Sequence, residues 1–477
     1  MLHARLKAGL AGALLLGAFA APALAQDDLV ARGEYLAKAG DCTACHTTKG
    51  GEAMAGGYVF KMPMGTIISS NITPSKTNGI GNWTEEQFAR ALREGVSADG
   101  RRLYPAMPYT SYSNITDDDM KALYAYFQQA VKPVDADPVR KTELDFPFNL
   151  PGEMAAWDLL YANGKPFTPD PKLNDQQNRG KYLVDGLAHC STCHTPRNSM
   201  MAEESDKFLS GAVVDGWMAS NITPDENSGI GGWSEDEIAT YLKTGHVEGK
   251  AQAGGPMADA VEHSFQHLTD EDTHAIAAYL KTIPAIATSK TAQPAYSYGK
   301  VSPVDWTQYE PGEGASDTKD YTDTSTTDGP LLYNVNCAAC HGINGEGSDD
   351  GHFSSLTHNT AVGAETPDNL VMAIVDGIHR ESADGNAVMP AFAPETQVIH
   401  TGLDNDQIAA VSNFVTAQFG RGDAGLTGSK VASIRAGAPL PFLLKNAAAL
   451  AIIGFVIGAL VIIALIFWAV KRSRKTA

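Results

Sequence analysis

The pattern Cys-x-x-Cys-His occurs three times in this chain of 477 residues, and the three copies use all six of its cysteines. The copies begin at Cys42, Cys190 and Cys337. This spacing is typical of covalent haem attachment, because two thiols can bond to one porphyrin while the next imidazole binds its iron. A chain that carries three such segments has to fold around three flat, largely apolar groups.

Three other interpretations of the cysteine pairs fit less well. A redox-active pair of the thioredoxin type would leave the histidine after each pair unexplained. A structural zinc site gathers four ligands from two such pairs, and three pairs divide badly into tetrahedral sites. Disulfides across only two residues are usually strained or catalytic. We therefore predict three covalently bound haem c groups, held by Cys42, Cys45, Cys190, Cys193, Cys337 and Cys340.

Each haem iron needs two protein ligands. The expected proximal ligands are the three motif histidines, His46, His194 and His341. Met107 and Met257 lie 150 residues apart, and both precede the last predicted helix of their unit. The other methionines of these units, Met218 included, have no counterpart in the other copy and are expected to pack. In the third unit we prefer Met389, in a loop, to Met372, which lies within a helix-like stretch.

An internal repeat sets the domain boundaries. Three segments recur: Asn-Ile-Thr-Pro at 71–74 and 221–224, Gly-Ile-Gly-x-Trp at 79–83 and 229–233, and Arg-Gly-x-Tyr-Leu at 32–36 and 179–183. We predict a signal peptide (1–25), a first unit (26–135), a packed connection (136–175), a second unit (176–286), a flexible linker (287–325), a third unit (326–420), a spacer (421–446), a transmembrane helix (447–470) and a cytoplasmic tail (471–477).

The predicted fold is mainly α, with three class I cytochrome c-like haem domains in tandem and one C-terminal transmembrane helix. Capping boxes begin a middle helix in each of the first two units, at Thr84 and Ser234. Polar residues that cap a helix also precede the last helix of each unit, predicted at 120–129, 273–282 and 408–419.

The two ends of the chain predict export and a membrane anchor. A basic start, an apolar stretch and a small-residue cleavage site at 23–25 are typical of a secretory signal. The uncharged run at 447–470 exceeds the roughly 20 apolar residues that cross a bilayer. Four Lys and Arg residues follow it at 471–475, which indicates the cytoplasmic side. We expect a single-pass protein of the bacterial inner membrane that faces the periplasm, with its C-terminus in the cytoplasm.

Charge and motifs exclude other functions. The net charge of −19 makes nucleic acid a poor partner. The sequence contains no dinucleotide-binding fingerprint and no serine nucleophile elbow, so we assign no catalytic residue. Irons with both axial positions filled can only change oxidation state, which predicts an electron-transfer subunit.

These motifs, with Leu-Tyr-Pro-Ala-Met-Pro-Tyr at 103–109 and Gly-Pro-Met-Ala at 255–258, resemble the trihaem cytochrome c subunits of membrane-bound dehydrogenases of acetic acid bacteria. Within that family the resemblance is greatest to the subunits of flavin-dependent sugar dehydrogenases, that for D-fructose among them. The resemblance implies a catalytic partner subunit, a flavoprotein that oxidises a sugar or polyol. It also implies a small third subunit in some complexes, and ubiquinone as the electron acceptor.

Other functions remain open from the sequence. The same family contains cytochrome subunits of pyrroloquinoline quinone alcohol dehydrogenases and molybdenum aldehyde dehydrogenases. A haem peroxidase or reductase would need one iron with an open position, which binding of carbon monoxide or cyanide would reveal. A cytochrome subunit of a terminal oxidase would purify without a dehydrogenase partner.

Overall fold

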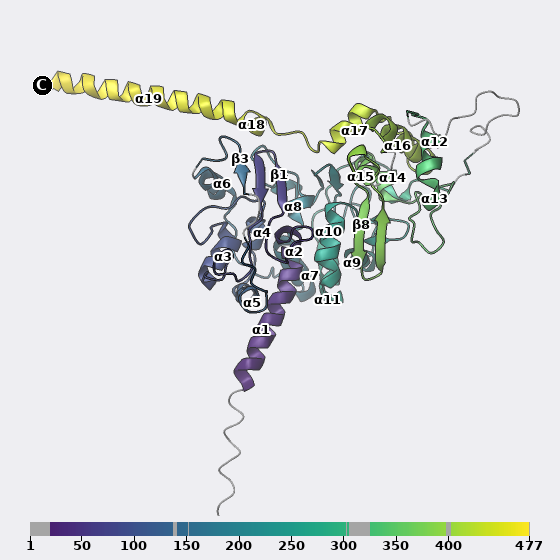
Figure 1. Cartoon of the computed structure of the whole chain (residues 1–477), viewed down its shortest axis with the longest axis horizontal. Coiled ribbons are helices and arrows are strands. Elements are labelled where there is room, and N and C mark those ends of the chain that lie inside the picture. Colours follow the sequence, from purple (N-terminus) through teal and green to yellow (C-terminus); the bar gives the residue numbers. More distant parts are fainter. Residues whose placement is uncertain are drawn as a thin grey trace, which may run out of the picture.

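The computed structural model describes residues 20–136, 141–150, 152–301, 303–304, 325–396 and 402–476. Helices dominate this part of the chain, and the strands form four small antiparallel sheets. Figure 1 shows a body of packed helices from which α19 projects. The predicted signal segment lies outside the described residues except for 20–25, which form the first turns of α1.

The α-helices are α1 (Ala20–Ala39), α2 (Cys42–His46), α3 (Glu85–Glu94), α4 (Tyr109–Tyr112), α5 (Asp117–Gln129), α6 (Glu153–Tyr161), α7 (Asp175–Tyr182), α8 (Ser191–His194), α9 (Glu235–Thr244), α10 (Pro256–His263), α11 (Asp270–Leu280), α12 (Gly329–Asn336), α13 (Ala338–His341), α14 (Thr360–Gly363), α15 (Asp368–Asp376), α16 (Asn405–Phe419), α17 (Gly428–Arg435), α18 (Phe442–Lys445) and α19 (Ala447–Thr476). The strands are β1 (Val59–Met62), β2 (Gly65–Ile68), β3 (Glu143–Leu144), β4 (Ala212–Val214), β5 (Trp217–Ala219), β6 (His246–Val247), β7 (Ala251–Gln252), β8 (Ile378–Ser382) and β9 (Gly385–Met389).

The same crossing of two helices recurs in all three units, between α1 and α5, between α7 and α11, and between α12 and α16. A glycine lies at each crossing. A Cβ atom added to Gly33, Gly180 or Gly329 would lie 2.0, 1.8 or 2.5 Å from a backbone oxygen of the partner helix. No side chain fits in this space, so glycine is required for the close approach. This contact explains the glycine of the repeated Arg-Gly-x-Tyr-Leu segment.

The helix caps confirm the predicted starts of the middle helices. Thr84 and Ser234 each form a complete capping box. The last helix of each unit begins three residues earlier than predicted, at Asp117, Asp270 and Asn405. Each predicted start is the fourth residue of its helix. The capping side chains of Thr116, Thr269 and Asp404 accept hydrogen bonds from the backbone N–H of the third residue, which places the true start one turn earlier.

Buried apolar residues of the first two units form one continuous core. It includes Leu36 and Leu123 from the first unit and Leu183, Ile276 and Leu280 from the second. The third unit has a separate core on α12, α15 and α16, to which the second unit contributes the buried Trp217. The first two units therefore share an interior, whereas the third is packed beside them.

Each of the first two units supplies one tyrosine whose hydroxyl group donates a hydrogen bond to an aspartate of the other unit. The Tyr182 hydroxyl donates to Asp119 Oδ2 at 2.7 Å, and the Tyr35 hydroxyl donates to Asp272 Oδ2 at 2.5 Å. Each aspartate also receives a hydrogen bond from an arginine of its own unit. The Arg32–Asp119 and Arg179–Asp272 bonds measure 2.6 and 2.7 Å. The repeated Arg-Gly-x-Tyr-Leu segment thus supplies both the internal and the reciprocal contact, and we call the four bonds the Tyr–Asp exchange.

The third unit contacts the second through amide and backbone groups. The Asn369 side chain on α15 accepts from Met218 N at 2.7 Å and donates to Met218 O at 3.0 Å. The Thr360 backbone N–H and hydroxyl both donate to Lys250 O at 2.8 Å. Arg380 on β8 donates to Ala253 O at 3.0 Å. The first two units also share bonds of this kind, from Asn114 Nδ2 to Asp185 O at 3.3 Å and from Ser264 Oγ to Ala39 O at 3.3 Å, but these surround a common apolar core.

Two segments differ from the sequence-based expectations. Met389 was expected in a loop, but it ends β9 and pairs with Ile378, because Ala383 and Asp384 form a two-residue hairpin turn between Ser382 and Gly385. The linker was expected to be an exposed strap. Around Tyr296 it instead contacts the second unit, where the Lys250 ammonium lies 5.0 Å from the tyrosine ring centre.

The predicted connection at 136–175 contributes β3 to the sheet β1-β2-β3 and contains α6. Met154 and Trp157 of α6 are buried beside Tyr109. Leu159 points outward and is 81% exposed. The connection therefore has one face packed on the first unit and one exposed face.

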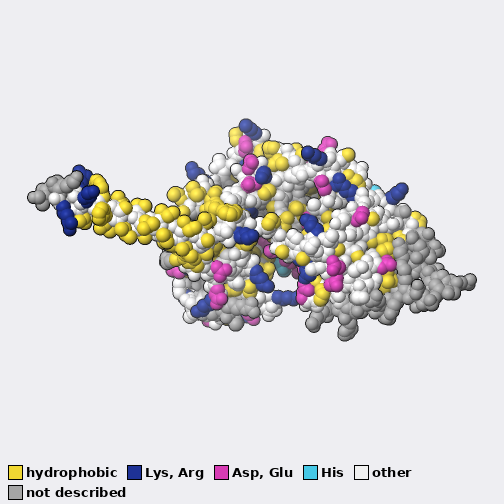
Figure 2. All heavy atoms as spheres, turned by 90° about the horizontal axis from the view of Figure 1, so that it is seen from above, with side chains coloured by type: hydrophobic (Ala, Val, Ile, Leu, Met, Phe, Trp, Pro, Cys, Tyr) yellow, Lys and Arg dark blue, Asp and Glu magenta, His cyan; other side chains and the backbone are white. Residues whose placement is uncertain are grey.

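The C-terminal helix α19 is long and apolar enough to cross a membrane over Ala447–Arg474, and no other helix among the described residues is. Its side chains are exposed along its length. Figure 2 shows it as an apolar rod with Lys and Arg side chains near its tip. The span matches the run predicted from the sequence.

Candidate functional site

Each Cys-x-x-Cys-His segment forms a short helical turn, at α2, at α8 and at α13. The six cysteines are all free thiols. Burial raises the pKa of Cys42, Cys190 and Cys337 to about 12, so these thiols are protonated at neutral pH. Protonated thiols are poor nucleophiles, so these three cysteines are poor candidates for redox catalysis.

The three motif histidines are oriented in the same way. Nδ1 of His46, His194 and His341 lies 2.7, 2.6 and 2.9 Å from a serine backbone oxygen. A carbonyl oxygen only accepts, so each Nδ1 carries the proton and donates it. Burial lowers the pKa of all three imidazoles, which favours the neutral form. Nε2 is therefore left as a free lone pair, the arrangement found in histidines that bind metal.

The serine carbonyls belong to Ser70, Ser220 and Ser354. The sequence analysis missed them, although a signal exists in two of the three cases. Ser70 and Ser220 each directly precede the repeated Asn-Ile-Thr-Pro segment. Ser354 has no such segment after it, so spacing alone could not identify it.

The Asn-Ile-Thr-Pro segment holds its serine carbonyl in place. Asn71 Oδ1 accepts from the backbone and hydroxyl of Thr73, and its Nδ2 donates to Val134 O at 2.8 Å. Asn221 makes the same bonds to Thr223 and donates to Ile286 O at 2.6 Å. The asparagine thus ties the serine segment to the chain that follows the last helix of its unit.

A glycine completes the support of each histidine. The backbone N–H of Gly56, Gly211 or Gly347 donates to the carbonyl of the motif histidine, at 2.7, 2.7 and 2.8 Å. A Cβ atom on Gly56 would lie 2.5 Å from the backbone of the serine segment. The glycine therefore lets that segment lie directly against the histidine turn. Its distance in sequence from the histidine differs between the units, so the repeat did not reveal it.

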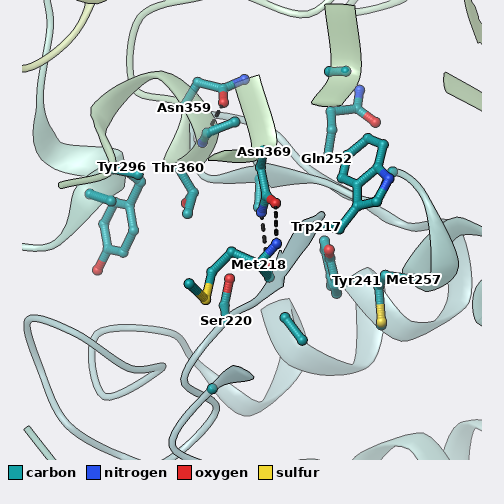
Figure 3. Close-up of a pocket in the computed structure, with 18 of the residues that line it drawn as sticks. Trp217, Met218, Ser220, Tyr241, Gln252, Met257, Tyr296, Asn359, Thr360 and Asn369 are labelled. Atoms are coloured by element: carbon teal, nitrogen blue, oxygen red, sulfur yellow. Dashed lines mark hydrogen bonds between the residues drawn. The ribbon is translucent and has the colours of Figure 1, made fainter. Parts of the chain in front are cut away.

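One cavity of about 940 Å³ joins the second and third sites. The predicted residues that line it are Cys190, Cys193, His194 and Met257 from the second unit and Cys337, Cys340, His341 and Met389 from the third. Figure 3 shows part of this cavity, with Met257 and Tyr241 on one side and Asn369 bridging to Met218. The structure thus brings both thiols, the imidazole and the predicted methionine of each unit to a shared space.

The other methionines divide into two groups. Met372 is 3% exposed and packs in the third core, and Met54 is 5% exposed and packs in the first. Met218, which has no counterpart in the repeat, also lines the shared cavity. At the first site, Cys42 and Met107 pack against the same core.

This donor set fits a c-type haem at each segment. Paired thiols can form the thioethers, a neutral imidazole offers Nε2, and a thioether sulfur is available from methionine. The bound group would supply one-electron redox chemistry. The chain holds each imidazole in one tautomer, and the wall of the cavity at the second and third sites is largely apolar.

Comparison with known proteins gives the family. The Cytochrome c family model matches residues 30–130 and 326–418. The fructose dehydrogenase cytochrome subunit of Gluconobacter japonicus is 44% identical, over 95% of this chain and 93% of that protein. The gluconate 2-dehydrogenase cytochrome c subunit of Pantoea cypripedii is 39% identical, over 89% and 94%. The cytochrome c subunit of the quinone alcohol dehydrogenase of Gluconacetobacter polyoxogenes is 39% identical, over 87% and 86%. These matches confirm the resemblance, and the chain belongs to the family of cytochrome c subunits of dehydrogenase complexes.

Proposed function

We propose that this chain carries three haem c groups and passes electrons from a catalytic dehydrogenase subunit to ubiquinone. The partner in this proposal is an FAD-dependent sugar or polyol dehydrogenase, and a small third subunit completes the complex. The identity to the fructose dehydrogenase cytochrome subunit over nearly the whole chain supports this partner class. Another relative is the cytochrome c subunit of a quinone alcohol dehydrogenase, which supports a quinone as the electron acceptor.

The threefold His–Ser contact is the observation that carries the proposal. The same hydrogen bond fixes the tautomer of His46, His194 and His341. Three sites built alike are what a chain of electron carriers needs, because each site must hold its group in one geometry through repeated oxidation and reduction. In this proposal the axial partners are Met107, Met257 and Met389, and the six motif cysteines form the thioethers.

The chain is proposed to lie on the periplasmic face of the inner membrane. The signal segment would export the three units, α19 would anchor them, and the tail after it would remain in the cytoplasm. The apolar, fully exposed span of α19 supports this arrangement.

Purification of the full chain in mild detergent tests the function. We expect an intact mass that includes three haem groups, together with a co-purifying flavoprotein. Fewer than three added haem masses would contradict the haem assignment. A co-purifying subunit that contains pyrroloquinoline quinone would instead favour the alcohol dehydrogenase function, which the 39% identical relative supports.

Ligand binding separates electron transfer from catalysis at a haem. An electron-transfer protein whose haem irons have both axial positions filled should bind neither carbon monoxide nor cyanide at native pH. A weak far-red absorption band in the oxidised protein is expected from methionine ligation. Stoichiometric carbon monoxide binding to one haem would favour a peroxidase or reductase.

A further inference from the structure

We propose that Gln252, a residue of the second unit, positions the proximal histidine of the third site. Gln252 ends β7, in the hairpin that reaches from the second unit toward the third. Its Nε2 donates to the Ser354 hydroxyl at 2.7 Å. The Ser354 backbone oxygen accepts the Nδ1–H bond from His341 at 2.9 Å. A single serine thus connects an amide of one unit to the imidazole of the next.

The other two serines lack this support. Ser70 and Ser220 are exposed, whereas Ser354 is half-buried. In the part of the chain that the structure describes, neither exposed serine has a partner for its hydroxyl. The asparagine that follows Ser70 and Ser220 supports their segments from within their own units. In the third unit Ser355 follows Ser354 and makes the equivalent contacts to Thr357. The bond from Gln252 is therefore an additional contact, from the neighbouring unit, that Ser70 and Ser220 do not have.

The repeat shows that this hairpin position is used to reach out of its own unit. Gln252 pairs with His246 in the second unit, and Arg102 pairs with Val96 at the equivalent place in the first. Arg102 forms an ion pair with Asp158 on α6, in the connection. The position therefore carries an inter-segment contact in both units, and the residue type differs with the partner.

The second amide atom of Gln252 faces the shared cavity. Gln252 lines the cavity between the second and third sites, and its Oε1 is buried. Among the described residues this oxygen has no hydrogen-bond partner. Figure 3 shows Gln252 on the wall beside Trp217.

Through this bond the second unit would influence the reduction potential of the third haem centre. This inference rests on the proposed function. A hydrogen bond from an imidazole to a fixed acceptor raises the basicity of the ligand, which favours the oxidised iron. Loss of the Gln252 bond removes the contact that the second unit makes with Ser354 and so weakens the bond from His341. The reduction potential of the third centre should then rise, while the other two centres keep theirs.

The test compares four variants of the full chain and uses a fifth, Met389→His, to assign the third centre. Gln252→Met removes the amide at similar volume, and Ser354→Ala removes the hydroxyl but keeps the backbone carbonyl. The double variant tests whether the two act as one unit. Gln266→Ala is the matched control, because Gln266 also donates from the second unit to the third, to Glu381 O at 3.0 Å, from an exposed position. Redox titration of the three centres and their low-spin electron paramagnetic resonance signals are the measurements.

We expect Gln252→Met and Ser354→Ala to raise the same single midpoint potential and to move one resonance signal, with no further shift in the double variant. Met389→His, which changes the proposed ligand, identifies that centre as the third. Unmoved potentials in both single variants, or an equal shift in Gln266→Ala, would overturn the positioning role. Fewer than three haems in the unaltered chain would instead overturn the proposed function. A chain with three haems and an unmoved third centre refutes only the role of Gln252.

Discussion

The two contacts between neighbouring units are built differently. The first and second units share one apolar core, and the Tyr–Asp exchange surrounds it with matching bonds from each side. The second and third units keep separate cores and meet through Asn369, Gln252 and backbone groups, with a cavity between them. The first contact has the character of a domain interior, and the second has that of a docked interface.

This difference separates two requirements of an electron carrier. A shared interior makes the first two units one cooperative folding unit, because neither can open without exposing the core of the other. A polar contact around a cavity brings two sites together while leaving each unit its own stability. The predictions below test this contrast, beginning with the largest expected effect.

Replacing Asp272 by alanine should destabilise the first and second units together. The carboxylate is buried and binds both Arg179 and Tyr35, so its loss leaves a cation and a hydroxyl without a partner. Breaking a buried ion pair in this way costs about 3 to 5 kcal/mol. Hydrogen exchange followed by mass spectrometry should show faster exchange in α5 and α11 alike, with α16 unchanged.

Asp270→Ala is the control for this variant. Asp270 lies two residues away at the start of the same helix, but its side chain is 80% exposed and pairs with Lys243. Its removal should change the exchange rates little, since exposed pairs contribute at most about 1 kcal/mol. Faster exchange confined to α11 in Asp272→Ala would show that the first unit does not depend on the contact.

Alanine at the helix crossings should reveal which units unfold together. A Cβ atom on Gly180 would lie 1.8 Å from Ala275 O, and one on Gly329 would lie 2.5 Å from Ala410 O. Each forces the helices apart, at a cost of about 3 kcal/mol. Gly180→Ala should loosen the first unit as well as the second, whereas Gly329→Ala should loosen the third alone. If the Gly329→Ala variant also showed faster hydrogen exchange in the first unit, this would contradict a separate core in the third unit.

The repeated units and their helix caps could be predicted because their signals are local. A capping box is read from residues three apart, as at Thr84 and Ser234, and the structure contains both. The cysteine and histidine segments are equally local. The C-terminal span is read from hydropathy alone, and α19 covers it.

Contacts between distant segments could not be predicted in this way. Ser354 lies 13 residues after His341 with no marker beside it, and Gln252 lies 102 residues before that serine. The strand that ends at Met389 depends on a turn at Ala383 and Asp384, a short hairpin signal that the helical pattern obscured. Such contacts depend on how the units pack against one another, and local sequence periodicity carries no information about that packing.

Removing the amide of Asn369 should weaken the docked interface by about 1 to 2 kcal/mol. The side chain makes two bonds to the backbone of Met218, so its loss frees β5. Asn413→Ala is a matched control, because Asn413 makes the same two bonds to Leu426 within the third unit. Asn369→Ala should speed exchange in β5 and leave α7 unchanged, whereas the control should act only within the third unit. Equal effects of both variants on β5 would argue against a separable interface.

Acid should weaken the first contact through Asp272, with a smaller effect than removing the carboxyl group. Burial raises the pKa of Asp272, but hydrogen bonds from Arg179 and Tyr35 outweigh it and hold that pKa below its usual value. A lowered pKa contributes stability that is present above the unfolded value of about 4 and is lost as the pH falls below it. Between pH 5 and about pH 3, the protection of α11 against hydrogen exchange, relative to the intrinsic exchange rate at each pH, should therefore fall more steeply in the unaltered chain than in Asp272→Asn. The Asn369 amide does not titrate, so its bonds to β5 should be insensitive to this change. Equal slopes in the two chains would mean that the carboxylate does not stabilise the shared core through its charge.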